Sequence, residues 1–272
     1  MSTGQKVIKY LAMAFAIGLA ISIISSIFQG VMMFTGFMDE DNTYEDKNME
    51  VREISSIEFN SLDIDIFGSE LVIKEGDSYK VETNNKYIKT KSEGNTLYIE
   101  EDEHRFFKKI DGSKVTVYIP SGSKLNEVNI DTGAGSMNIN YLNTSNLDLE
   151  LGAGKVNIDS LAVSNKADID TGAGEVIIGS SILNNLDLDL GVGSFKMDAE
   201  ISGNSNIDQG VGEVSLNLKG SKNDYSISLD KGLGSAVIDG VNIKDDTVIG
   251  NGNSRMNISG GVGSIKVNFV EN

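Results

Sequence analysis

Residues 129–158 read NIDTGAGSMNINYLNTSNLDLELGAGKVNI, and this stretch holds the pattern that decides the fold. It contains two Gly-Ala-Gly turns, at residues 133–135 and 152–154, and apolar residues stand at every second position on both sides of each turn. Alternation with a period of two is typical of a β-strand that buries one face. The stretch therefore predicts a repeated unit of strand, glycine turn, strand and polar turn.

The same unit recurs along the second half of the chain. Gly-x-Gly elements start at residues whose numbers differ by 19, 20, 19, 19, 22 and 20: Gly133, Gly152, Gly172, Gly191, Gly210, Gly232 and Gly252. In the last of them the second glycine is Ser254, and the spacing of 22 places extra residues in an extended turn at 219–224. Because neither strand of a unit can bury its apolar face alone, successive units must stack about 4.8 Å apart. The prediction is an all-β fold, a β-solenoid of two-strand rungs of about twenty residues each.

This pattern divides the chain into regions. Residues 125–272 are predicted to form the regular solenoid, and residues 51–124, where the alternation is weaker, degenerate rungs or an N-terminal cap. The stretch 261–269 follows Gly252 by only nine residues, so it is predicted to be a C-terminal capping strand rather than a whole rung.

The N-terminal region predicts a membrane anchor. From Tyr10 to Met38 the chain has 29 consecutive residues without Asp, Glu, Lys or Arg, and about twenty apolar residues span a bilayer. Lys6 and Lys9 before this segment place the N-terminus in the cytoplasm and the repeats outside. The alternative is a cleaved signal peptide, whose apolar region is shorter. An acidic linker over residues 39–50 is expected to follow residues 1–38, the cytoplasmic stub and single-pass anchor.

Small residues recur every fourth position within the predicted membrane helix: Ala14, Gly18, Ser22, Ser26 and Gly30. Such a stripe lets a second helix approach closely, which would allow helix-mediated self-association. Small residues are also common in membrane helices that have no partner. The stripe therefore predicts no particular oligomer.

Composition excludes several classes of function. The net charge of −17 opposes binding to nucleic acid, which we exclude as a partner. The chain has no Cys, so thiolate chemistry and Cys-based metal sites are excluded as well, and its single His, His104, disfavours His-based metal sites and a Ser-His-Asp triad. The Gly-x-Gly turns lack the helix and glycine pattern of nucleotide-binding loops. We predict no catalytic residues and no cofactor.

Acidic residues precede the glycine turn in successive repeats. Rungs stacked in register would align them in an outward column, where neighbours repel by about 0.9 kcal/mol in water and a divalent cation would relieve the repulsion. The predicted calcium ladder is Asp131, Glu150, Asp170, Asp189, Asp208 and Asp230, with Asp148, Asp168 and Asp187 in the next outward column. No repeat has the Gly-Gly-x-Gly-x-Asp spacing of calcium-binding solenoids. Calcium binding is therefore expected to be weak at best, and the alternative is a solvated face that discourages lateral association of sheets.

Two of these acids stand in Asp-Thr-Gly elements like the paired loops of aspartic proteases. A shared-proton dyad needs carboxylates about 3 Å apart. Asp131 and Asp170 are predicted to be two rungs apart, about 9.6 Å. An aspartic protease is therefore the weaker alternative, and the Asp-Thr-Gly elements are predicted to be structural.

The chain resembles a bacterial family of β-strand-repeat proteins known as “putative adhesin” and described as toastrack-like. The resemblance rests on the repeats of the Asp-Thr-Gly-Ala-Gly type at residues 131–135, on residues 94–99 and 115–120, and on the closing stretch 261–267. It implies a solenoid domain behind a single membrane helix, in bacterial genomes and near envelope stress regulators, with no established catalytic residues.

The resulting functional prediction is a non-catalytic protein of the cell envelope with an adhesin-like binding or scaffold role. An accessory role in the envelope stress response is one form that this function could take. Its partner would be an envelope protein or polymer that the sequence does not name. The alternative from another class is a carbohydrate-active solenoid enzyme, which would need acids and aromatic residues in one groove.

Overall fold

The structure is a computed structural model that describes residues 50–53, 59–102 and 112–271. The predicted membrane helix and the linker up to residue 49 lie outside these ranges. Within them, no helix has the length and hydropathy needed to cross a bilayer.

Strands make up most of the described chain, which confirms the all-β prediction. The exception is η2 (Lys222–Asp224), a short 3-10 helix in the stretch 219–224 where the longest repeat was predicted to hold an extended turn. The strands are β1 (Glu50–Glu53), β2 (Ser61–Ile66), β3 (Glu70–Gly76), β4 (Lys80–Thr83), β5 (Ile88–Glu93), β6 (Thr96–Glu101), β7 (Lys114–Pro120), β8 (Leu125–Ile139), β9 (Leu142–Asn184), β10 (Leu186–Ser202), β11 (Asn204–Lys219), β12 (Tyr225–Asp230), β13 (Leu233–Ile238), β14 (Val241–Asn242), β15 (Thr247–Gly250) and β16 (Ser254–Val270).

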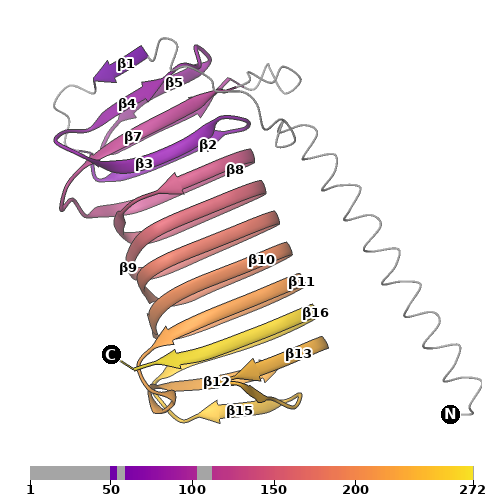
Figure 1. Ribbon diagram of the computed structural model, residues 1–272. Coiled ribbons are helices and arrows are strands. Elements are labelled where there is room, and N and C mark those ends of the chain that lie inside the picture. The colour runs from indigo at the N-terminus through magenta and orange to yellow at the C-terminus, as the bar shows by residue number, and fades with distance from the viewer. Residues whose placement is uncertain (1–49, 54–58, 103–111, 272) are drawn as a thin grey trace, which may run out of the picture. The chain divides into compact units, whose positions relative to one another are not determined.

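The long strands β8 to β11 stack in parallel as successive rungs (Figure 1). Equivalent positions lie beside one another: Ile130 pairs with Leu149, and Leu188 pairs with both Ile169 and Ile207. The side chains in these apolar columns are buried and form one continuous hydrophobic core. The stacking of rungs predicted from the repeat is therefore present, because each rung covers the apolar side chains of its neighbour.

Close backbone contact explains the glycine turns. A Cβ atom on Gly172 would lie 2.2 Å from the carbonyl oxygen of Gly152, and one on Gly174 would lie 1.9 Å from that of Gly154. Gly154 and Gly174 also have φ angles of 147° and 148°, which side-chain-bearing residues rarely adopt. We call these turns the glycine corner; its first glycine is required by close approach, and its second by close approach and backbone conformation together.

The opposite corner of the rungs carries stacked asparagines. Asn165 Nδ2 donates to Asn146 Oδ1 at 2.7 Å, and Asn185 Nδ2 donates to the Asn165 carbonyl at 2.9 Å. Asn204 N then donates to Asn185 Oδ1 at 3.0 Å. This series satisfies polar groups where each rung turns. It also fixes the register between rungs.

The N-terminal part of the chain forms two further rungs and a cap. β2 and β3 pair with the two halves of β8, and β6 and β7 pair with β2 and β3 in turn. Beyond them, β4, β5 and β1 run antiparallel and cover the end of the stack (Figure 1). Antiparallel strands end the parallel series because they return along the last rung instead of adding another.

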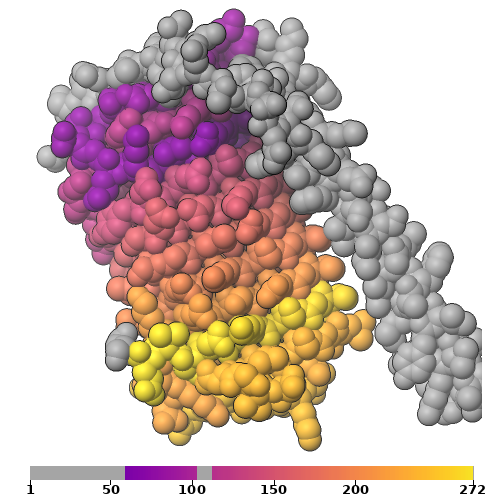
Figure 2. Space-filling model, in the orientation of Figure 1, coloured from indigo at the N-terminus to yellow at the C-terminus, as the bar shows by residue number. Residues whose placement is uncertain are grey.

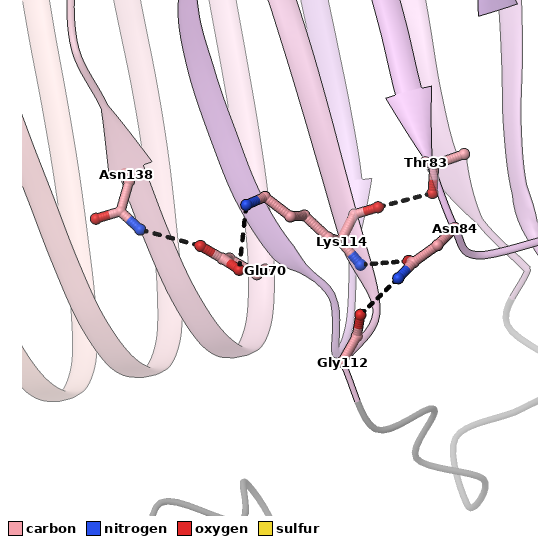
Figure 3. Close-up of polar contacts among 6 residues, drawn as sticks. All are labelled: Glu70, Thr83, Asn84, Gly112, Lys114 and Asn138. Atoms are coloured by element: carbon pink, nitrogen blue, oxygen red, sulfur yellow. Dashed lines mark hydrogen bonds and ion pairs between the residues drawn. The ribbon is translucent and has the colours of Figure 1, made fainter. Parts of the chain in front are cut away.

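Polar contacts fasten this cap to the rungs (Figure 3). The Lys114 backbone N–H donates to Asn84 Oδ1 at 2.8 Å, and Asn84 Nδ2 donates to the Gly112 carbonyl at 2.7 Å. Thr83 Oγ1 donates to the Lys114 carbonyl at 2.8 Å, and Asn138 Nδ2 donates to Glu70 Oε1 at 3.3 Å. The end of β4 is thereby bonded to the start of β7.

The carboxylate of Glu101 accepts hydrogen bonds from the backbone of the turn between β2 and β3. The turn lacks the Gly-x-Gly pattern, and the backbone N–H groups of Phe67 and Gly68 donate to Glu101 Oε2 at 2.9 and 3.2 Å. Asn85 Nδ2 donates to Glu101 Oε1 at 2.8 Å. Glu101 thus accepts from backbone groups at this turn.

The C-terminal end differs from the prediction. β16 is a whole rung that lies between β11 on one side and β12 and β13 on the other (Figures 1 and 2). Its glycine corner is Gly261 to Gly263, since Val262 pairs with Val211 and Gly263 with Gly212. The prediction of a capping strand at 261–269 was wrong, as was the glycine turn at Gly252. The end of the stack is formed by β12 to β15 instead.

Candidate binding groove

The predicted acidic residues form one outward column. Asp131 pairs with Glu150, Asp189 pairs with both Asp170 and Asp208, and all five side chains are exposed. The stacking of Gly172 on Gly152 brings Asp170 beside Glu150. Asp230 belongs to the same column, but the inserted β16 places Ser259 between it and Asp208.

The column continues through two acids that sequence reasoning missed. Asp65 pairs with Asp131, and Glu100 pairs with Asp65. The signal was present, because residues 62–66 alternate apolar and acidic residues as residues 186–190 do. We define the acidic column as seven consecutive carboxylates: Glu100, Asp65, Asp131, Glu150, Asp170, Asp189 and Asp208.

A shallow groove of about 710 Å³ runs along five of these rungs. Each rung contributes three residues to the lining: the acid, the residue after it and the first glycine of the glycine corner. The first set is Asp131 to Gly133 and the last is Asp208 to Gly210. We call it the acidic groove. Gly152, Gly172, Gly191 and Gly210 are exposed there, so the backbone is open to a ligand beside the carboxylates.

The five acids of the groove are not neutralised by the described part of the chain. None of them forms an ion pair with a described residue. In the neighbouring column, by contrast, Lys166 Nζ lies 2.6 Å from Asp168 Oδ2 and 3.9 Å from Asp187 Oδ2. The groove therefore has the stronger uncompensated negative charge of the two columns.

Burial and mutual repulsion raise the pKa of two carboxyl groups. The pKa of Asp189 lies above its usual value of 3.8. The first cause is partial desolvation of this largely exposed carboxyl group by the surrounding rungs, and the second is the neighbouring charge of Asp170 and Asp208. The pKa of Asp148 is raised first by burial and then by Asp168 and Asp170. Both shifts mean that charging these groups in the folded state has a free-energy cost.

The arrangement offers carboxylates in a row rather than a closed set of metal ligands. Among the residues that the structure describes, no three or more Asp, Glu, His or Cys side chains converge closely enough to hold a metal ion. A high-affinity calcium site needs six to eight oxygen ligands around one point. The calcium ladder remains a prediction of weak binding.

The two Asp-Thr-Gly aspartates are not neighbours in the column. Asp131 pairs with Glu150, and the rung of Glu150 lies between those of Asp131 and Asp170. The separation of two rungs is about 9.6 Å. A single shared proton between Asp131 and Asp170 would need contact at about 3 Å.

Comparison with known proteins places the chain in a family. The family model Toastrack DUF4097 matches residues 59–267. None of the curated proteins matches the chain.

Several solved structures are similar to the chain at low identity. A “putative adhesin” from Bacteroides fragilis is 16% identical, with 81% of this chain and 97% of that chain covered and a TM-score of 0.44. A “putative cell adhesion protein” from Clostridium sporogenes is 18% identical, with 82% and 99% covered and a TM-score of 0.35. A “putative lipid binding protein” from Parabacteroides distasonis is 12% identical, with 83% and 98% covered and a TM-score of 0.25.

Structural similarities with such low TM-scores and sequence identities support no conclusion about a ligand or partner. The family match does not depend on them, because it covers more than half of the chain and includes both the N-terminal rungs and β16. On this match, the chain belongs to the Toastrack DUF4097 family.

Proposed function

We propose that this protein is a non-catalytic, adhesin-like binding protein of the bacterial cell envelope, and that its binding face is the acidic groove. The observation that carries the proposal is the groove itself, where five carboxylates without an ion-pair partner among the described residues stand in register beside exposed glycine backbone. The ligand that suits this surface is an extended segment with repeated positive charges, supplied by an envelope protein or polymer. A rigid stack of rungs holds the charges at fixed spacing, which favours a repetitive ligand.

The test compares two variants with the same change in net charge. The groove variant replaces the acids by their amides at Asp131, Glu150, Asp170, Asp189 and Asp208. The control variant does the same at five exposed acids elsewhere: Glu75, Asp77, Glu93, Glu200 and Asp246. The full-length chain in detergent is titrated with polylysine at physiological salt. We expect the groove variant to lose at least tenfold in affinity and the control variant less than threefold; equal losses would contradict a specific groove.

Membrane attachment is the second part of the proposal. The apolar segment Tyr10–Met38 and the preceding lysines support a single-pass anchor with the repeats outside the cytoplasm. Protease is added to cells whose cytoplasmic membrane is intact and whose outer envelope layers have been made permeable. It should digest the repeats and leave the anchor in the membrane fraction. A mature chain that begins after Met38, or repeats that are protected from protease, would contradict this topology.

A carbohydrate-active enzyme is the alternative. Its substrate cleft would require aromatic platforms as well as acids, and the lining of the acidic groove has no aromatic side chain. A protease built on Asp131 and Asp170 is disfavoured by the intervening rung of Glu150. Release of reducing ends from cell-wall polysaccharide, lost in the groove variant and retained in the control variant, would favour the enzyme over the binding protein.

A further inference from the structure

The last strand of the chain occupies a slot inside the stack. β16 pairs with β11 through residues 255–270 and, on its other side, with β12 and β13. β12 and β13 have no pairing with β11, so among the described strands β16 alone joins them to the preceding rungs. In Figure 2 the yellow band of β16 separates the two orange regions. We call the position between β11 and the pair β12 and β13 the β16 slot.

The backbone of the slot selects the sequence that fills it. A Cβ atom on Gly261 would lie 2.2 Å from the carbonyl oxygen of Gly210, and one on Gly263 would lie 1.8 Å from that of Gly212. Gly263 also has a φ of 152°. A strand can therefore enter the slot only if it has glycines at these two positions.

Side-chain amides on both halves of the strand add to this selection. Asn257 Nδ2 donates to Asn206 Oδ1 at 3.1 Å, and Asn268 Nδ2 donates to Asn217 Oδ1 at 2.8 Å. The buried side chains of β16 stand at alternate positions and complete the core columns of β11: Met256, Ile258, Ile265 and Val267. β16 therefore matches the slot in this register by its glycines, amides and apolar residues.

Connectivity leaves the slot to be filled late. Residues 225–250 precede β16 in the chain, yet β12 and β13 can stack on the rungs only after β16 has inserted. The link from β15 to β16 is three residues long, Asn251 to Asn253, and Gly252 lies within it. Domain swapping, in which two copies of a chain exchange an identical element, is favoured by a short hinge loop beside the exchanged element. The three-residue loop before β16 is such a hinge.

We infer that the β16 slot accepts β16 from a second copy of this chain, so that protomers join by exchange of their C-terminal strands. The partner is a second copy because the slot requires the glycine and asparagine positions of β16. This association uses the β-structure itself and does not depend on the acidic groove.

Disulfide trapping tests the exchange, since the native chain has no cysteine. Full-length chains carrying Asn206→Cys alone are refolded together with chains carrying Asn257→Cys alone, over a range of concentrations. Strand exchange brings the two cysteines together at paired positions, where the distance between neighbouring strands permits a disulfide. We expect a disulfide-linked heterodimer whose yield exceeds that of either homodimer and rises with concentration.

Two controls make the outcome decisive. Asp187 and Asn206 are paired in the same way between β10 and β11, which exchange of β16 leaves within one chain. A mixture of Asp187→Cys chains with Asn206→Cys chains should therefore give no preferred heterodimer. A chain carrying both Asn206→Cys and Asn257→Cys should close an intramolecular disulfide as a dilute monomer. The intramolecular disulfide shows that the paired positions 206 and 257 can be bridged. The inference is overturned if the two mixtures then give equal amounts of heterodimer.

Discussion

At the scale of single residues, the glycine corner sets how closely two rungs approach. A methyl group on Gly174 would meet the Gly154 carbonyl oxygen at 1.9 Å, and the residue also holds a φ of 148°. We predict that Gly174→Ala lowers the free energy of unfolding by more than about 3 kcal/mol, because overlap and backbone strain add. Gly172→Val should be similarly damaging because of the 2.2 Å approach to Gly152.

Gly68→Ala is the matched control for this prediction. A Cβ atom on Gly68 meets no heavy atom within 4 Å, and its φ is not in the positive range. Its effect should be within about 0.5 kcal/mol. Urea unfolding followed by far-ultraviolet circular dichroism measures all three variants, and equal stability of Gly174→Ala and Gly68→Ala would contradict the account of the corner.

A second residue-scale prediction concerns pH. The pKa of Asp189 is raised by burial and by Asp170 and Asp208, so its carboxyl group binds a proton more tightly in the folded than in the unfolded state. The protonated Asp189 carboxyl group therefore stabilises the folded state at pH values below its unfolded-state pKa of 3.8. This stabilisation is lost as the pH rises through the higher pKa of the folded state. Asp189→Asn should therefore raise the melting temperature at pH 7, and should give no gain near pH 3. The gain should be no more than about 1 kcal/mol, because solvent screens the charge of this exposed group.

The control for the pH prediction is Asp77→Asn, an exposed acid outside the acidic column. It should leave the melting temperature unchanged at both pH values. A gain for Asp189→Asn that persists at pH 3 would show that lost charge is not the cause.

At the scale of elements, Glu101 holds the turn between β2 and β3. It accepts from the backbone N–H groups of Phe67 and Gly68 and from Asn85. Glu101→Ala leaves these donors without that acceptor, and we predict a loss of about 2 kcal/mol. Amide hydrogen exchange should accelerate at Phe67 and Gly68 and not in β16. Glu100→Ala, which removes the neighbouring exposed acid, is the control and should leave these rates unchanged.

Prediction of the elements from sequence succeeded where the period was unambiguous. The Gly-x-Gly spacing and the alternation of apolar residues identified the rungs from β8 to β11. Residues 252–254 and 261–263 both match the glycine turn, however, and stacking in chain order favours the first. Which of them lies on Gly210 is decided by long-range pairing of β16 with β11, which a local pattern does not contain.

The same limit applies to the candidate site. Five acids of the column follow from the repeat, because each precedes a glycine turn. Asp65 and Glu100 do not precede such a turn. The alternation at residues 62–66 marks Asp65 as an outward acid, but the pairing of β2 with β6 and β8 is what assigns Asp65 and Glu100 to this column. The asparagines of the opposite corner recur at spacings of 19 and 20 residues, from Asn146 through Asn165 and Asn185 to Asn204, a signal available in the sequence.

At the scale of the whole molecule, the acidic column makes a prediction about calcium. Carboxylates in a row about 4.8 Å apart supply few ligands to any one ion. Calorimetry on the full-length chain should therefore show dissociation constants no tighter than about the millimolar range. The groove variant should show no binding. Submicromolar affinity, or a melting temperature that rises by many degrees with calcium, would show that the column forms closed sites.

The central claim is that the acidic groove is the binding face, and a zero-length crosslink tests it most directly. Polylysine bound to the full-length chain is coupled with a water-soluble carbodiimide, which joins lysines to the carboxylates they contact, and the joined peptides are identified by mass spectrometry. The account predicts that crosslinks concentrate on the five groove acids and are rare at Glu75, Asp77, Glu93, Glu200 and Asp246. Crosslinks spread evenly over both sets of acids would contradict it.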